Sequence, residues 1–238
     1  MPFKTTLNYS PNFNSKKRQK KEVRFIILHY TGMKSEKAAI NRLTNIQSQV
    51  ASHYLITRNG KTINLVPDLY IAWHAGNSSW KNFNSLNKNS IGIEITNPGH
   101  QFGYKKFSSQ QKRSLISLSK FLIKKYKINR KNILGHSDVA PLRKKDPGER
   151  FPWEYLAKKR IGYWHNLNKR QLSKFRNKNC NYLVRKKFFN YLFKIGYSKK
   201  YKNKNDKHVT KAFQRRFRPE LVNGKIDQEC LLISKNLA

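Results

Sequence analysis

The stretch VRFIILHY, residues Val23 to Tyr30, is a near-continuous run of β-branched, aromatic and other apolar side chains. Such a run is typical of a central strand that is buried on both faces of a sheet. We therefore expect the folded core to begin here, with His29 at the end of the strand. Residues 1–22 have no apolar periodicity and carry a basic run at Lys16 to Lys21, which predicts an extended basic N-terminal arm.

Two further features follow this strand. Ser35 is placed to cap a helix that continues through Leu43. The segment HYLITRNGKTINLV, His53 to Val66, breaks at Asn59-Gly60. Because Asn-Gly is the strongest short hairpin signal, we expect two antiparallel strands here.

The next segments continue the alternation of strands and helices. Ser90 to Thr96 alternates isoleucine with small or polar residues, which predicts a strand with Glu94 on the face opposite the isoleucines. Ser108 to Tyr126 opens with a capping-box pattern and continues with leucines at helical spacing, which predicts a long helix. Ile133 to Gly135 predicts a short strand that ends at His136. The fold class we expect is α/β, with a mixed central β-sheet flanked by helices and a groove along the carboxyl ends of the strands.

The composition changes to Lys, Asn and Arg after Tyr163. We expect a catalytic domain over residues 23–165, a linker over 166–179 and a small three-helix domain over 180–238. The helices predicted for this last part are Leu183 to Lys194, ended by Gly196, then Val209 to Phe217, and a third that starts at Gln228 after the cap Asp227.

The charge balance is extreme, with 51 Lys and Arg against 12 Asp and Glu and a net charge of +39. This predicts attraction to polyanions and weak, salt-sensitive binding to nucleic acid, or simply that Lys is the default exposed residue. A nucleic-acid-binding protein is a rival interpretation, but we find no reading helix or stacking motif and expect no specific nucleic-acid partner.

Cysteines and apolar segments limit the class of protein further. Cys180 and Cys230 are too few for a disulfide framework or a thiolate zinc cluster, and whether they pair stays open. Phe25 to Leu28 is too short for a signal-peptide core or a membrane span. We expect a cytoplasmic monomer without a transmembrane segment, with the periplasm or cell envelope as the alternative location.

Three residues have the types and positions of a hydrolytic zinc site. His29 and His136 end two predicted strands, and Asp146 closes the loop that His136 opens. Such a site needs three N or O ligands and an open place for water, whose pKa the metal lowers toward about 7 while it polarises the scissile carbonyl. Glu94 is then the candidate general base, and Lys144 the candidate cation for the developing oxyanion.

Residue types and spacing leave alternatives for each of these roles. Asp138 could replace Asp146 as ligand, and His53 or His74 could replace either histidine. A lone histidine at a strand end is more often structural than a ligand, and Glu94 could be the polar side of a half-exposed strand. Spacing alone does not choose among Lys144 and its neighbours Arg143 and Lys145.

Several segments together resemble one known family. They are ILHYT (27–31), SHYLITRNGKTINLV (52–66), AWHAG (72–76), NSIGIEI (89–95) and GHSDVAPLRKKDPG (135–148). In this order, over roughly residues 23–160, they are similar to the zinc-dependent N-acetylmuramoyl-L-alanine amidases of the amidase type 2 family. The last segment is the most specific of them.

The resemblance implies a role for each candidate. It implies that His29, His136 and Asp146 bind one zinc ion per chain, that Glu94 handles the proton and that Lys144 steadies the oxyanion. Asp138 is not a ligand in the family pattern. His74 is then a possible substrate contact, Trp73 a side chain that stacks on sugar or peptide, and His53 structural.

The implied activity is hydrolysis of the amide bond between N-acetylmuramic or anhydromuramic acid and L-alanine in bacterial peptidoglycan or its fragments. This is a reaction of peptidoglycan catabolism, in cell-wall turnover and recycling. The alternative is a non-catalytic peptidoglycan recognition protein, against which the presence of all three ligand positions argues. Intact wall and anhydro-muropeptide both stay open as substrate.

The C-terminal VTKAFQRRFRPELVNGKID, residues 209–227, resembles the three-helix peptidoglycan-binding module that is often appended to such amidases. The pair Phe213 and Phe217 is more often core than ligand groove. The segment is unusually basic, so a structural buttress is the alternative to a glycan-binding module.

Overall fold

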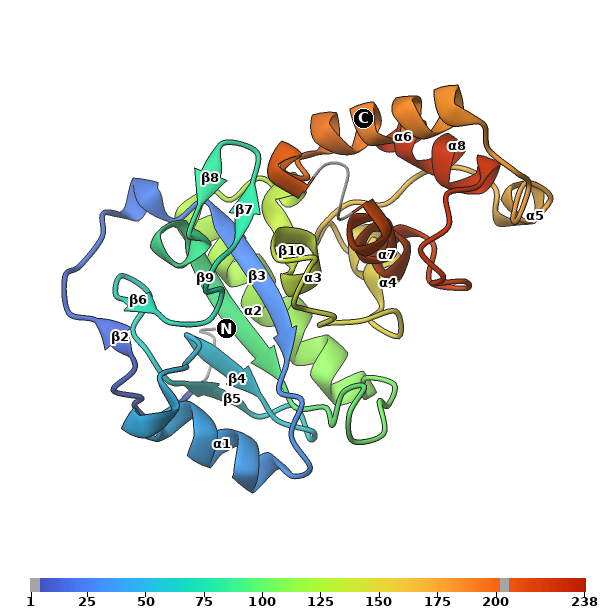
Figure 1. The fold of residues 1–238 in the computed structure, drawn as a ribbon. Coiled ribbons are helices and arrows are strands. Elements are labelled where there is room, and N and C mark those ends of the chain that lie inside the picture. The colour runs from blue at the N-terminus through green and yellow to red at the C-terminus, as the bar shows by residue number, and fades with distance from the viewer. Residues whose placement is uncertain (1–4, 202–205) are drawn as a thin grey trace.

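The computed structural model describes residues 5–201 and 206–238. Within these residues the centre is a six-stranded sheet with strand order β1-β5-β4-β9-β3-β10 (Figure 1). Its strands are β1 (Thr6–Leu7), β3 (Phe25–Tyr30), β4 (Tyr54–Ile56), β5 (Thr62–Asn64), β9 (Ser90–Ile95) and β10 (Ile133–Gly135). Neighbours run parallel except β4 and β5, which are antiparallel, so the predicted mixed sheet is confirmed.

Short strand pairs and helices surround this sheet. The antiparallel pairs are β2 (Phe13–Asn14) with β6 (Ile71–Ala72), and β7 (Ser79–Trp80) with β8 (Phe83–Asn84). The α-helices of the described residues are α1 (Glu36–Thr44), α2 (Ser109–Tyr126), α3 (His136–Val139), α4 (Trp153–Lys158), α5 (Lys169–Ser173), α6 (Tyr182–Ile195), α7 (Asp206–Phe217) and α8 (Gln228–Leu237). Short 3-10 turns lie at Lys20–Glu22, Ile46–Ser48, Leu86–Asn89, Arg130–Asn132 and Lys199–Tyr201.

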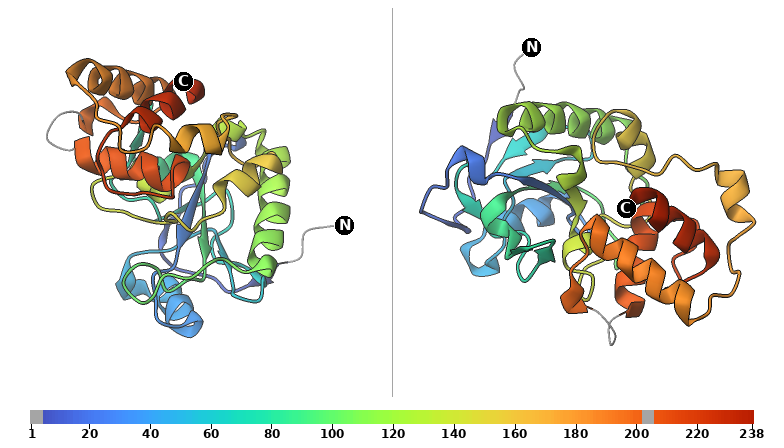
Figure 2. Two further views of the ribbon diagram at one scale, coloured as in Figure 1. Left: turned by 90° about the vertical axis from the view of Figure 1, so that its right-hand side faces the viewer. Right: turned by 90° about the horizontal axis from the view of Figure 1, so that it is seen from above.

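One face of the sheet packs on α2. Strand side chains alternate between faces, and one set from β3 and β9 shares a core with the leucines of α2: Ile26, Leu28, Ile91, Ile93, Ile95, Leu115, Leu118 and Leu122. Figure 2 shows α2 lying along this face. The apolar side of the strand pair is therefore closed, and the other face is left for polar residues.

The opposite face carries the polar residues and is covered at both sides by other helices. The register places His29 beside Glu94 on this face. On one side Leu43 of α1 packs with Leu55 of β4. On the other, Phe25 and Ile27 belong to the same core cluster as the aromatic side chains of α6 and α7.

Local signals in the sequence are confirmed at several helix ends. Ser35 accepts a hydrogen bond from Ala38 N–H, and Ser108 and Gln111 form the capping box of α2. Gly196 ends α6, and Asp227 caps α8.

The structure adds detail where no pattern was found. Met1–Lys4 lie outside the described residues, but Thr6–Leu7 of the predicted arm pairs with β5, and the side chain of Arg18 is buried. The predicted linker contains α5, whose Leu172 is buried. His136 is the first residue of α3 rather than a strand end.

The C-terminal helices pack together, and α6 and α8 lie side by side (Figures 1 and 2). Phe213 and Phe217 are buried in their core and not in a groove. Residues 202–205 of the predicted C-terminal domain lie outside the described residues. Cys180 and Cys230 are both free thiols. Among residues 5–201 and 206–238, no helix is both long and apolar enough to cross a bilayer.

Candidate active site

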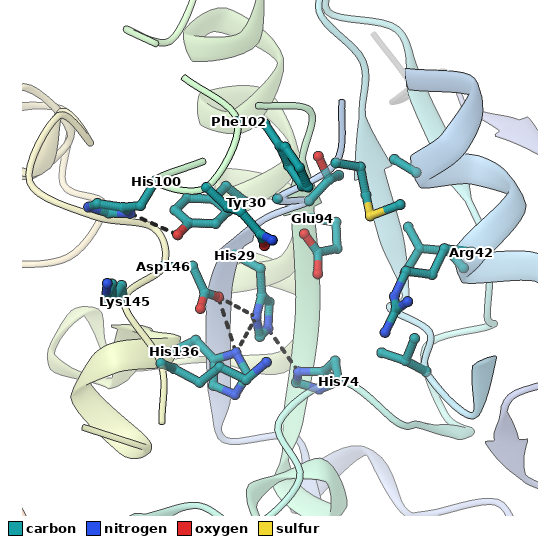
Figure 3. A pocket seen from close by; sticks show the side chains of 18 of the residues that line it. His29, Tyr30, Arg42, His74, Glu94, His100, Phe102, His136, Lys145 and Asp146 are labelled. Atoms are coloured by element: carbon teal, nitrogen blue, oxygen red, sulfur yellow. Dashed lines mark hydrogen bonds and ion pairs between the residues drawn. The ribbon is translucent and has the colours of Figure 1, made fainter. Parts of the chain in front are cut away.

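Three side chains converge at the carboxyl ends of β3 and β10. Nδ1 of His29 lies 2.9 Å from Nδ1 of His136 and 3.0 Å from Oδ2 of Asp146, and the last two atoms are 3.1 Å apart. All three residues are buried, and their side chains point toward one another (Figure 3). This geometry selects Asp146 rather than Asp138, because Asp138 accepts hydrogen bonds from Gly135 N–H and the Tyr197 hydroxyl instead.

Hydrogen bonds behind the imidazoles leave the Nδ1 lone pairs free for a ligand. Nε2–H of His136 donates to the carbonyl of Ala75 at 3.1 Å. His29 Nε2 contacts His74 Nδ1 at 3.1 Å, and His74 Nε2 contacts the Ser90 hydroxyl. Because that hydroxyl donates to Leu86 O, it accepts from His74, and His74 in turn accepts from His29.

The electrostatics fit a cation at this point. Burial and the neighbouring His136 lower the pKa of His29 to about 4, so its imidazole is neutral near pH 7. Burial raises the pKa of Asp146, but the two histidines outweigh it and hold that pKa well below its ordinary value. A tetrahedral zinc ion with bonds of about 2.0–2.1 Å spaces its ligand atoms roughly 3.3 Å apart, close to the observed separations. Two imidazole nitrogens and one carboxylate oxygen are thus a donor set that fits zinc.

Glu94 lies on β9 next to this cluster and faces the same cavity (Figure 3). Its Oε2 is buried without a hydrogen-bond partner among the described residues. Burial, together with the charge of Asp146, raises the pKa of Glu94 to about 8. A carboxyl group with a pKa within about one unit of neutral pH and a free oxygen is suited to accept and return a proton.

The three basic residues before Asp146 differ in their surroundings. The guanidinium of Arg143 donates to the carbonyl groups of Ala75 and Asn77. Lys144 is half-buried and lines the cavity, and its charge lowers the pKa of Glu94. Lys145 is exposed at the rim of the cavity. Lys144 is therefore the cation of the three that combines partial burial with an electrostatic effect on Glu94.

The family profile described as N-acetylmuramoyl-L-alanine amidase matches residues 19–149, which include every residue of this site. The chain belongs to this family of amidases. It is 34% identical over 229 residues to the N-acetylmuramoyl-L-alanine amidase AmiD of Escherichia coli, covering 90% of this chain and 82% of AmiD. It is 40% identical over 113 residues to the 1,6-anhydro-N-acetylmuramyl-L-alanine amidase AmpD of Haemophilus influenzae, covering 47% of this chain and 59% of AmpD.

Solved structures extend the likeness over nearly the whole chain. AmiD from E. coli, in complex with the substrate anhydro-N-acetylmuramic acid-L-Ala-D-gamma-Glu-L-Lys, superposes with a TM-score of 0.80 at 31% identity, covering 94% of this chain and 91% of AmiD. AmpDh3 from Pseudomonas aeruginosa, in complex with anhydromuramic pentapeptide, gives a TM-score of 0.79 at 29% identity, covering 94% and 95%. The C-terminal helices therefore belong to an architecture that these amidases share.

The side chains predicted to contact the substrate, and His53 beside them, have different surroundings. His74 is buried and lines the cavity, but both of its ring nitrogens have partners within the protein. Trp73 donates its indole N–H to Asn14 and is not among the described residues that line this cavity. His53 accepts a hydrogen bond from Gly92 N–H at Nδ1, which agrees with a structural role. Substrate contact by His74 or Trp73 stays a prediction.

The cavity also contains residues that the sequence did not reveal. Its volume is about 990 Å³, and Arg42 of α1 and Phe102 line it. The Tyr30 hydroxyl lies 2.8 Å from Nδ1 of His100, which also lines the cavity (Figure 3). Behind it, Nε2 of His100 lies 3.0 Å from Oε2 of Glu149. Only the position of Tyr30 directly after His29 pointed toward the site, because the other residues come from separate loops and a helix.

Proposed function

We propose that this chain is a zinc-dependent amidase that hydrolyses the amide between the lactyl group of N-acetylmuramic or anhydromuramic acid and L-alanine in peptidoglycan fragments. The observation that carries this proposal is the convergence of His29, His136 and Asp146 beside Glu94, whose Oε2 has no hydrogen-bond partner among the described residues. The resemblance to AmiD and AmpDh3, whose structures hold anhydromuramyl peptides, supports the substrate class.

The chemistry divides between the ion and the protein. His29, His136 and Asp146 would hold a zinc ion, which would lower the pKa of the attacking water and polarise the scissile carbonyl. Glu94 accepts the proton of the attacking water and delivers it to the departing amine of L-alanine. The ammonium of Lys144 stabilises the negative charge that develops on the carbonyl oxygen.

The cavity rim suits an acidic peptide. Lys34, Arg42 and Lys145 line it together with the site residues. Stem peptides carry D-glutamate and free terminal carboxylates, so a cationic rim in a chain of net charge +39 attracts them and raises the encounter rate. The cytoplasmic location expected from the sequence stays a prediction, which cell fractionation would test.

The decisive experiment offers purified protein a muropeptide and an anhydro-muropeptide and follows the products by mass spectrometry. We expect release of the free peptide, loss of activity with a chelator and recovery with added zinc. Asp146→Ala should lose both zinc and turnover, whereas Glu220→Ala, which removes a surface carboxylate that pairs with Lys169, should keep both. Binding of the muropeptide without cleavage would indicate a recognition protein instead.

A further inference from the structure

The side chain of Arg216 in α7 extends from the C-terminal helices into the catalytic part of the chain. Its side chain and that of Asp138 are each 1% exposed and form a buried ion pair between Nη1 and Oδ2. Nη2 donates to the carbonyl of Ile133 at 2.9 Å. The guanidinium also lies 4.3 Å from the ring centroid of Trp153. The planar fork of arginine is therefore fixed on several sides.

Asp138 connects this arginine to the metal site. It lies in α3, the four-residue helix that begins with the ligand His136. Its Oδ2 also accepts from Gly135 N–H at 2.7 Å, at the start of that helix, and its Oδ1 accepts from the Tyr197 hydroxyl at 2.9 Å. Both partners from the C-terminal part, Arg216 and Tyr197, thus hold the same carboxylate.

The same short helix also holds Asp146, the ligand from the loop that follows it. Ser137 N–H donates to the backbone carbonyl of Asp146 at 2.8 Å. A shift of α3 would therefore move both His136 and Asp146 relative to His29, which β3 holds separately. Four helical residues provide little stability of their own, so the position of α3 depends on what packs and pairs with it.

We infer that Arg216 is a positioning residue of the metal site, through which the C-terminal helices hold α3 and so set the affinity for zinc. This inference rests on the proposed function only for the identity of the metal. In addition to any contact with glycan, the C-terminal helices are then a structural part of the catalytic centre. Removing a residue that holds metal ligands in place from behind typically weakens metal binding by about 10–100-fold.

The test measures zinc affinity of the full chain by competition with a chromophoric chelator. Arg216→Met, which keeps the length of the side chain and removes the fork, should bind zinc roughly 10–100-fold more weakly. The visible spectrum of its cobalt form should also change, because the ligand geometry changes. Arg216→Lys, which keeps the charge but has no fork to reach both partners, should fall between Arg216→Met and the natural protein.

Arg218→Met is the matched control. Arg218 is also 1% exposed, but it pairs with Asp227 and Glu229 within the C-terminal part. The Arg218→Met substitution should lower the thermal stability and leave the zinc affinity and the cobalt spectrum unchanged. If Arg216→Met is folded and binds zinc as the natural chain does, or if Arg218→Met weakens zinc equally, the inference is wrong.

A smaller change keeps the test decisive if Arg216→Met does not fold. Tyr197→Phe removes one hydroxyl from Asp138 and keeps the buried ring. It should weaken zinc binding in the same direction, and unchanged zinc affinity would contradict the inference. A natural chain that binds zinc tightly and cleaves no muropeptide would disprove the proposed function alone, because these readouts do not depend on turnover.

Discussion

Nε2 of His29 lies 3.1 Å from Nδ1 of His74, and this contact determines which nitrogen of His29 faces the metal site. A series of hydrogen bonds runs from His29 through His74 and the Ser90 hydroxyl to the carbonyl of Leu86. It requires His29 to carry its proton on Nε2, which leaves the lone pair of Nδ1 for the ion.

His74→Phe should therefore weaken zinc binding. The substitution keeps a ring of similar size but removes the acceptor of the His29 proton, so either tautomer of His29 becomes accessible. We expect a loss in zinc affinity of roughly 10–100-fold, measured by chelator competition. His165→Phe replaces another buried histidine, beside Trp164, and should leave zinc affinity unchanged. Equal affinity for the natural chain and His74→Phe would show that the contact with His29 is incidental.

Gly92→Ala should destabilise the fold through the same histidine. An added Cβ at Gly92 would lie 2.5 Å from Cγ of His74, closer than such atoms approach. Overpacking of this kind costs typically about 1–3 kcal/mol, which urea unfolding would measure. In a His74→Ala background the cost should shrink, because the clashing ring is gone. A cost that is the same in both backgrounds would place its origin elsewhere.

Glu94→Gln should separate proton transfer from metal binding. The amide has nearly the same shape as the carboxyl group but cannot take a proton from water. Because general acid–base catalysis contributes typically about 10²–10⁴-fold, we expect kcat for muropeptide cleavage to fall by that factor. Zinc affinity should remain within a few fold of the natural value, since Glu94 is not one of the three converging ligands. A variant that retains its full kcat would remove Glu94 from the reaction.

Asp68 should make the fold sensitive to acid. Burial raises the pKa of Asp68, but hydrogen bonds from Lys125, Tyr54 and Tyr126 outweigh it and lower that pKa below its ordinary value. A lowered pKa in the folded state stabilises the protein above the unfolded pKa of about 3.8, and this contribution is lost as the pH falls through the folded value.

We therefore expect Asp68→Asn to lower the free energy of unfolding by about 1–3 kcal/mol at neutral pH, with a difference that begins to shrink as the pH falls below about 3.8. Urea unfolding from pH 7 down to about pH 3 measures both values. Tyr126→Phe removes one donor but no charge, so its cost should vary less with pH. A constant difference for Asp68→Asn over the whole range would show that its charge is not the stabilising feature.

The main elements of the fold were predictable because their signals are local. The apolar run of β3, the Asn-Gly turn of the β4–β5 hairpin and the capping box of α2 each depend on neighbouring residues. The pairing of β1 with β5 and the burial of Arg18 could not be predicted. Both belong to an extended segment without a periodic pattern, whose position is determined only by contacts with distant residues. The short α4 and α5 likewise had no clear signal.

The three converging ligands were predictable in type, and the resemblance selected Asp146 over Asp138. The sequence could not show that Asp138 would instead bind Arg216, because 78 residues separate the two and the pair forms only when α7 docks. The Tyr30, His100 and Glu149 contacts were hidden for the same reason. Tyr30 ends β3 and the other two residues lie in loops, so only the folded arrangement brings these single polar side chains together.

Lys144→Met tests which cation steadies the oxyanion. Lys144 is half-buried in the cavity wall, whereas Lys145 is exposed and the guanidinium of Arg143 is bound to carbonyl groups. Removing a group that stabilises a developing oxyanion costs typically about 10²–10³-fold in kcat, and we expect a loss of that size with KM changed little. Lys145→Met should affect mainly KM, through weaker attraction of the acidic peptide, and should do so less at high salt because screening removes that attraction. If the two variants lose kcat equally, the charge of the loop rather than one ammonium stabilises the transition state.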